Sequence, residues 1–302
     1  MNPEYLTALI LGGLTRGSIY ALIALGYTMV YGIIQLINFA HGEIYMIGAF
    51  TGLIVSTVLT MHGMPGFGVV FFAAAAAIIY ACCYGYTLEK IAYKPLRHAP
   101  RLSVLISAIG MSLFFQNYVL LAQTSNFLPF PGLIPDFEFW KPYSHVMSAT
   151  ELVIIVTTAI VMVLLTLLIK FTRIGKAMRA TSQDKIMASL LGINVNQIIS
   201  ITFIVGSATA AIGGLLIASH TGQINAYMGF LVGIKAFVAA VLGGIGSIPG
   251  AVLGAFVLGL SESVFTGYVS SDYEDVFAFL ILVLILIFRP SGILGRDQTQ
   301  KV

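Results

Sequence analysis

The amino-acid sequence predicts an all-α membrane protein, a polytopic bundle of about 8–10 transmembrane helices in a single domain. Three observations support this class. Hydrophobic residues make up 58% of the chain, charged residues only 9%, and the mean hydropathy is +0.97, which leaves too little polar surface for a soluble globule. Several apolar runs are long enough to cross a bilayer as helices. The period-two alternation that a β-barrel needs is absent from the sequence.

Nine apolar segments are expected to cross the membrane within this one domain, residues 1–302. The last three are short or contain Gly, so half-helices or re-entrant segments are alternatives there. Many of the 31 Gly residues lie inside apolar segments, which predicts close packing of helix backbones. In chain order the predicted spans are residues 6–33, 40–60, 67–89, 102–122, 150–170, 198–220, 230–244, 249–267 and 273–289.

Basic residues indicate the orientation. Of 15 Lys and Arg, four lie in residues 90–101, five in 170–185 and three in 289–301. Cytoplasmic loops carry an excess of Lys and Arg, so these segments are expected inside, with the N-terminus outside and the C-terminus inside. The opposite side should hold the acidic residues and interfacial aromatic anchors, namely Asp136, Glu138, Glu151, Asp272, Glu274 and Asp275 with Trp140 and Tyr143.

Two stretches break the apolar pattern. Residues 35–43 (QLINFAHGE) hold several polar side chains, and residues 242–250 (LGGIGSIPG) are rich in Gly. Each leads into a helix with a Gly-Ala-Phe step, a weak internal similarity between the two halves. Paired interruptions of this kind indicate the substrate path of a transporter, because backbone groups freed at a helix break must face a cavity or protein.

Polar residues at membrane depth are costly, so each is a candidate for the path. His41 and Glu43 either line it or anchor a helix end at the interface, and Glu262 lines a cavity or lies near the outer headgroups. Arg16 and Lys235 are expected to be paired or to extend to the interface. Further candidates, with structural hydrogen bonding as the alternative for the last two, are Gln35, Asn38, Gly42, Gln116 and Asn117.

Residues 170–197 form a basic island between two apolar runs. A helical turn is expected over residues 175–180, followed by a second short helix with Ser182 as its N-cap and Asp184 in its first turn. Gly192 supplies a left-handed residue that ends it. Four apolar residues then share one face of this helix, namely Ile186, Met187, Leu190 and Leu191. The helix is either a docking surface or an interfacial helix that lies on lipid.

Several motifs resemble those of a known family. Residues 175–180 (GKAMRA) and 187–193 (MASLLGI) resemble the cytoplasmic coupling segment of permeases from bacterial ATP-binding-cassette importers. Over essentially the whole chain, the sequence looks like the H-type subunit of high-affinity branched-chain amino-acid permeases. The motifs are residues 26–32 (GYTMVYG), 37–43 (INFAHGE), 105–110 (LISAIG), 235–250 (KAFVAAVLGGIGSIPG) and 289–295 (RPSGILG).

This resemblance implies an importer permease fold with pseudo-symmetric halves and interrupted helices in the bacterial inner membrane. It also implies two cytoplasmic ATPase subunits, a second related permease subunit and a periplasmic amino-acid-binding protein as partners. Asn38, His41, Gly42 and Glu43 would lie at the helix break beside the path. The coupling segment, about residues 172–197, would contact the ATPase through Gly175, Arg179, Ala180, Asp184, Met187, Ala188, Leu190, Gly192 and Ile193.

The sequence lacks the motifs of an enzyme. It has no G-x-x-x-x-G-K-[ST] loop, no H-E-x-x-H pair and no G-x-S-x-G elbow, so ATP is expected to be used by partner subunits and no cofactor to be bound by this chain. Adjacent Cys82 and Cys83 indicate neither a disulfide nor a metal site, and no nucleic-acid partner is expected. The alternatives are an ion-coupled secondary amino-acid carrier acting alone, with His41, Glu43 and Glu262 as a proton relay, and a scaffold or channel without coupling to ATP.

Overall fold

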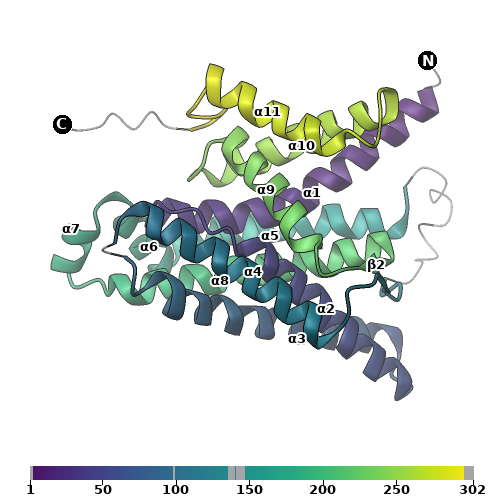
Figure 1. The fold of residues 1–302 in the computed structure, drawn as a ribbon, viewed down its shortest axis with the longest axis horizontal. Coiled ribbons are helices and arrows are strands. Elements are labelled where there is room, and N and C mark those ends of the chain that lie inside the picture. Colours follow the sequence, from purple (N-terminus) through teal and green to yellow (C-terminus); the bar gives the residue numbers. More distant parts are fainter. Residues whose placement is uncertain (1–2, 98, 135–139, 141–146, 296–302) are drawn as a thin grey trace.

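A computed structural model describes residues 3–97, 99–134, 140 and 147–295 of the chain. Over these residues the fold consists of α-helices, one π-helical turn and one pair of two-residue strands (Figure 1). In chain order the elements are α1 (Pro3–Ile34), α2 (His41–Met61), α3 (Gly66–Leu88), η1 (Glu89–Tyr93), α4 (Arg101–Ala122), β1 (Leu128–Pro129), α5 (Ala149–Phe171), α6 (Arg173–Gln183), α7 (Lys185–Leu190), α8 (Val195–Thr221), β2 (Gln223–Ile224), α9 (Met228–Gly243), α10 (Ile248–Tyr268) and α11 (Glu274–Phe288).

The all-α membrane bundle predicted from the sequence is confirmed. Each of the nine predicted spans corresponds to one apolar helix, namely α1 to α5 and α8 to α11, with ends that differ by a few residues. Among the described residues, seven helices are long and apolar enough to cross a bilayer, while α9 and α11 have only 16 and 15 residues. Of the predicted outer loop, Asp136, Glu138 and Tyr143 lie outside the described residues.

Small residues hold the centre of the bundle together. Helix α1 packs against α8, α9 and α10, and a Cβ placed on Gly17 would lie 2.9 Å from the Cα of Phe256 on α10. A Cβ on Gly48 of α2 would similarly lie 2.7 Å from the Cα of Ala211 on α8. Helices can approach this closely only where a side chain is missing, which explains the Gly content of the apolar segments.

Both predicted interruptions separate helices in the fold. Helix α1 ends at Ile34, and Gln35 has a left-handed backbone (φ 61°) that turns the chain back toward the bundle. The next helix, α2, begins with buried residues. Between α9 and α10, Gly244 (φ 103°) and Gly246 (φ 95°) make the turn, and the hydroxyl of Ser247 caps α10. Because Gly adopts positive φ more readily than other residues, the Gly residues of the second interruption are what allow the chain to turn there.

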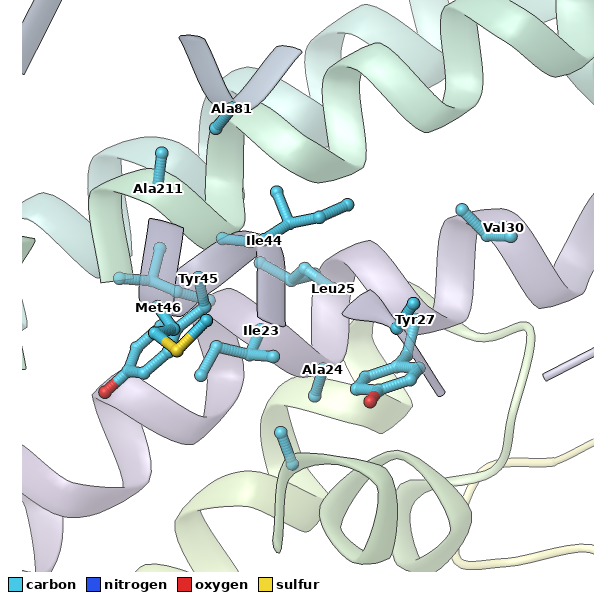
Figure 2. Close-up of a cluster of buried hydrophobic side chains, with 14 of the residues drawn as sticks. Ile23, Ala24, Leu25, Tyr27, Val30, Ile44, Tyr45, Met46, Ala81 and Ala211 are labelled. Atoms are coloured by element: carbon cyan, nitrogen blue, oxygen red, sulfur yellow. The ribbon is translucent and has the colours of Figure 1, made fainter. Parts of the chain in front are cut away.

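The bundle has two different ends. Figure 1 shows α6 and α7 at one end and the short strand pair containing β2 at the other. At the strand end, β1 pairs antiparallel with β2. Between these ends lies a buried apolar core, part of which is shown in Figure 2, where Ile44, Tyr45 and Met46 of α2 lie beside Ile23 and Leu25 of α1.

Candidate functional site

The basic island forms two helices joined at Asp184. Thr172 caps α6, accepting a hydrogen bond from the N–H of Gly175 at 3.0 Å. The predicted cap of the second helix was wrong. Ser182 lies inside α6, and its hydroxyl donates to the carbonyl of Arg179. The carboxylate of Asp184 instead accepts hydrogen bonds from two backbone N–H groups in the first turn of α7, those of Ile186 (2.8 Å) and Met187 (2.9 Å). The extended backbone of Asp184 between the helices makes it the cap.

Helix α7 and the residue that caps its end, Leu191, present an apolar ridge, called here the α7 ridge, which consists of Ile186, Met187, Leu190 and Leu191. These side chains are between 54% and 76% exposed, and Ala188 on the other side is buried. Gly192 ends the helix with φ 84°, as predicted, and its N–H donates to the carbonyl of Ser189. Large apolar groups concentrated on one exposed face of a helix indicate a binding surface.

Hydrogen bonds tie α6 and α7 to the ends of two long helices. The guanidinium of Arg179 donates to the carbonyls of Ile169 and Lys170 near the end of α5, and Lys185 donates to the carbonyl of Ile34 at the end of α1, at 3.3 Å. Burial lowers the pKa of Lys185 below its usual value, with a contribution from the charge of Arg97. The helix that carries the α7 ridge is therefore linked to the ends of α1 and α5 by side-chain hydrogen bonds to backbone carbonyls.

Gly175 and Ala180 complete the α6 contact. A Cβ on Gly175 would overlap the backbone of Leu168 and Ile169, so α6 lies directly against the end of α5. Ala180 is half-buried in α6, and Ile193, which follows the left-handed turn, donates from its N–H to the carbonyl of Ala188 at 3.0 Å. All the residues predicted for coupling thus lie in α6, in α7, at Asp184 between them or in the turn after α7.

The break between α1 and α2 brings four of the predicted path residues into the interior. Asn38, His41, Gly42 and Glu43 are all buried. The imidazole of His41 packs edge-on against Tyr27 with ring centroids 4.9 Å apart, and Gly42 meets the backbone of α9. These residues therefore lie at the junction of α1, α2 and α9, inside the bundle.

Two hydrogen bonds fix this junction to the neighbouring elements. Ser112 of α4 donates to Oε1 of Glu43 at 3.0 Å, while Oε2 has no partner among the described residues. The hydroxyl of Tyr93 in η1 donates to Oδ1 of Asn38 at 3.0 Å. A π-helical turn at such a point is typical of functional segments.

Four predicted path residues lie apart from the junction. Gln35 is exposed and Gln116 is half-buried, and Asn117 is exposed on α4, where its amide donates to the carbonyl of Leu113 in the same helix. Glu262 of α10 lies in a separate charged cluster described below.

Sequence reasoning did not bring together the charged residues of that cluster. Lys235 of α9 forms ion pairs with Glu262 (2.8 Å), Glu274 (2.6 Å) and Asp275 (2.8 Å), and Arg16 of α1 pairs with Glu274 at 2.8 Å. The expectation that Arg16 and Lys235 are paired agrees with these contacts. The sequence did contain one signal for this cluster. The last apolar segment begins with acidic residues, and acidic residues beside a membrane span need basic partners, which other helices had to supply.

A second ion-pair network, also missed, surrounds Glu89 in η1. Its carboxylate is fully buried, accepts a hydrogen bond from Ser200 of α8 at 2.8 Å and pairs with Arg97 and Lys90. A buried carboxylate needs such partners to offset its desolvation. The network fixes η1, and with it Tyr93, to the start of α8.

Comparisons with known proteins agree with this architecture. The family described as branched-chain amino acid transport system / permease component matches residues 9–286. The chain is 51% identical to the high-affinity branched-chain amino acid transport system permease protein BraD of Pseudomonas aeruginosa, over 99% of this chain and 98% of that protein. It is 46% identical to the corresponding protein LivH of Escherichia coli, over the full length of both.

A weaker likeness is to LivM of Escherichia coli, another permease protein of that transport system, at 25% identity over 95% of this chain and 70% of LivM. The family match covers nearly the whole bundle, including the α1–α2 break and the α6–α7 segment. The chain therefore belongs to the family of permease components of branched-chain amino acid transport systems.

Proposed function

We propose that this chain is a membrane-spanning subunit of an importer that moves leucine, isoleucine and valine across the bacterial inner membrane, driven by two separate ATPase subunits. The observation that carries the proposal is the α7 ridge, four large apolar side chains exposed at one end of the bundle on a helix that is hydrogen-bonded to α1 and α5. The relatives named above, permeases of branched-chain amino acid transport systems, supply the substrate class.

Coupling follows from the rigidity of the α6–α7 attachment. The ATPase binds the α7 ridge and moves when it binds nucleotide. This motion displaces α7 as a rigid unit, because Asp184 and Gly192 fix the two ends of the helix. Arg179 and Lys185 pass the displacement to the ends of α5 and α1. Since α1 leads directly into the break before α2, the motion reaches the junction around His41 and Glu43.

The remaining partners follow from the same assignment. A second, related permease completes the pore, supported by the likeness of this chain to LivM, and a periplasmic protein delivers the amino acid. The basic end holding α6 and α7 faces the cytoplasm, and the N-terminus of α1 faces the periplasm. ATP is hydrolysed by the partners, so this chain acts as a transport subunit and binds no cofactor of its own.

The path through the subunit should be mainly apolar. A branched-chain amino acid presents an apolar side chain and a small zwitterionic head, which needs few polar groups along the way. Buried Asn38, His41 and Glu43 supply polar groups at the α1–α2 junction, with Gly42 beside them. Four further residues remain candidates for contacts with the amino acid elsewhere along the path, namely Gln35, Gln116, Asn117 and Glu262.

A charge placed on the ridge tests the proposal. The full transporter, expressed with its partner subunits, should lose ATP-driven leucine uptake and co-purification of the ATPases when it carries Leu190→Glu, while the chain stays in the membrane. The matched control is Gln197→Glu, which places the same charge on an exposed position of the neighbouring α8 start, where an acid suits the helix dipole. Normal uptake and co-purification with Leu190→Glu would contradict docking at α7.

A further inference from the structure

A cavity of about 390 Å³ is lined in part by Gln223 and Ile224 of β2. Figure 1 shows β2 at the end of the bundle opposite α7. The walls of the cavity come from α1, α2, α8, α9 and α11, and its rim residues His220, Thr221 and Gln223 are exposed. Its volume is in the range of small-molecule sites in proteins, roughly 300–1,000 Å³. None of the path residues predicted from the sequence lines it.

The charged side of the cavity holds both signs. Arg16, Lys235, Glu274 and Asp275 line it, and Glu262 lies behind Lys235, so three carboxylates face two cations. Asp275 is half-exposed. An excess carboxylate next to a cavity is stabilised by an additional cation, and an ammonium group of the right size completes the charge balance.

The cations also have capacity for an anion. A guanidinium has five N–H donors, and among the described residues Arg16 uses its Nη1 for Glu274. The side chains of this pair are 36% and 21% exposed, so exchanging partners within it costs little free energy, on the order of 1 kcal/mol or less. A carboxylate entering the cavity can therefore bind Arg16 without breaking the buried contacts of Lys235.

A buried hydroxyl provides the independent observation. Tyr45 of α2 is fully buried, lines the cavity, and its hydroxyl has no hydrogen-bond partner among the described residues. Figure 2 shows its ring beside Met46 and Ile23, with the hydroxyl oxygen at the edge of the apolar cluster. An unsatisfied buried hydroxyl costs free energy, which a ligand that accepts its hydrogen bond recovers.

The rest of the cavity is apolar. Its apolar wall, defined here as Ile19, Ile217, Leu231 and Val232, comes from three helices. Aliphatic walls beside a compact group of donors and acceptors are the usual composition of a site for a small amphipathic molecule.

We infer that this cavity is a binding station for a zwitterionic branched-chain amino acid at the outer end of the subunit. Arg16 and the Tyr45 hydroxyl receive the carboxylate, and Glu274 and Asp275 receive the ammonium. The branched side chain lies on the apolar wall. This inference rests on the proposed function, which supplies the substrate class, and adds a site for it.

Protection of an introduced thiol tests the station. Leu231→Cys, in a chain with Cys82→Ala and Cys83→Ala, is labelled with a membrane-impermeant thiol reagent on spheroplasts that express the whole transporter. L-leucine should slow labelling at position 231. Isoamylamine, which lacks the carboxylate, and 4-methylpentanoate, which lacks the ammonium, should protect much less. The control Tyr273→Cys is exposed at the same end but does not line the cavity, so leucine should leave its labelling rate unchanged.

Adding Tyr45→Phe removes only the unpartnered hydroxyl. The leucine concentration needed for protection should rise about threefold to tenfold, the weakening expected from the loss of one hydrogen bond. Thiol labelling at 231 that leucine does not slow, or protection unchanged by Tyr45→Phe, overturns the station, while leucine uptake by the unlabelled transporter keeps the proposed function intact. Absence of that uptake in the unaltered transporter overturns the proposed function and the station together.

Discussion

The imidazole of His41 lies against the backbone of Gly26: a Cβ at position 26 would be 2.6 Å from Cε1 of the ring. This contact joins the first residue of α2 to the interior of α1. It exists because residues 35–40 turn back toward the bundle after α1 ends, so α2 starts in the core. The α1–α2 junction is therefore a packed joint, and changes there should affect both helices.

Replacing Gly26 with Ala should destabilise the protein. The added methyl group must displace the His41 ring or separate α1 from α8, and overpacking of this kind costs about 1–3 kcal/mol. The melting temperature of the purified chain measures the effect. Gly110→Ala is the matched control, since Gly110 is also inside a helix but has open space at its Cβ, and it should be neutral or slightly stabilising. Equal melting temperatures for the two variants would refute the packed joint.

Glu43→Gln separates the importer from a proton-coupled carrier. The amide oxygen keeps an acceptor for the Ser112 hydroxyl, so the junction stays intact. ATP-driven leucine uptake should continue with Glu43→Gln and fall with Glu43→Ala, which leaves a void and an unsatisfied hydroxyl. Uptake assays in vesicles loaded with ATP give the comparison. Complete loss with Gln, together with uptake driven by a proton gradient in ATP-free vesicles, would support the carrier instead.

Tyr93→Phe should loosen the connection between η1 and the α1–α2 break. The variant removes the hydrogen bond to Asn38 and leaves buried Oδ1 without that donor, at a cost of about 1–2 kcal/mol. Thermal unfolding of the purified chain is the measurement. Tyr268→Phe, at an exposed position on α10, serves as the control and should unfold at the parent temperature. An unchanged melting temperature for Tyr93→Phe would mean that this bond does not hold the break.

Gly192→Ala should weaken coupling without unfolding the bundle. A non-Gly residue in the left-handed region costs roughly 1–2 kcal/mol, which the chain can relieve by unwinding the end of α7. ATP-driven uptake is expected to fall, and a bulky acid at this position should abolish it. Gly66→Ala, at a helix start with nothing near its Cβ, should transport like the parent. Full uptake activity of both Gly192 variants would contradict the claim that coupling depends on the left-handed turn that ends α7.

Much of the fold could be predicted because membrane helices are set by local composition. Each apolar segment became a helix with ends close to the predicted ones, and Gly192 ended α7 as its residue type requires. The cap of α7 was wrong because Ser182 and Asp184 are both good capping residues two positions apart. Only the extended backbone at Asp184 decides between them.

The site was harder to predict, for a physical reason. The burial of Asn38, His41 and Glu43 depends on a left-handed Gln35, which no local pattern indicates. The cluster around Lys235 requires knowing that α1, α9, α10 and α11 meet, and one sequence without distances cannot show which helices are neighbours. Arg16 and Lys235 were expected to be paired or to extend to the interface, and the fold shows that both are paired and identifies their partners.

The most direct test of the central claim, that partners drive this subunit through α7 from the inner side, is the accessibility of one thiol. Leu191→Cys, in the chain with Cys82→Ala and Cys83→Ala, is treated with an impermeant thiol reagent on intact cells and on inside-out vesicles. We predict labelling only in the vesicles, and slower labelling when the ATPase subunits are bound. Labelling on intact cells, or labelling in vesicles that the ATPases leave unchanged, would contradict the account.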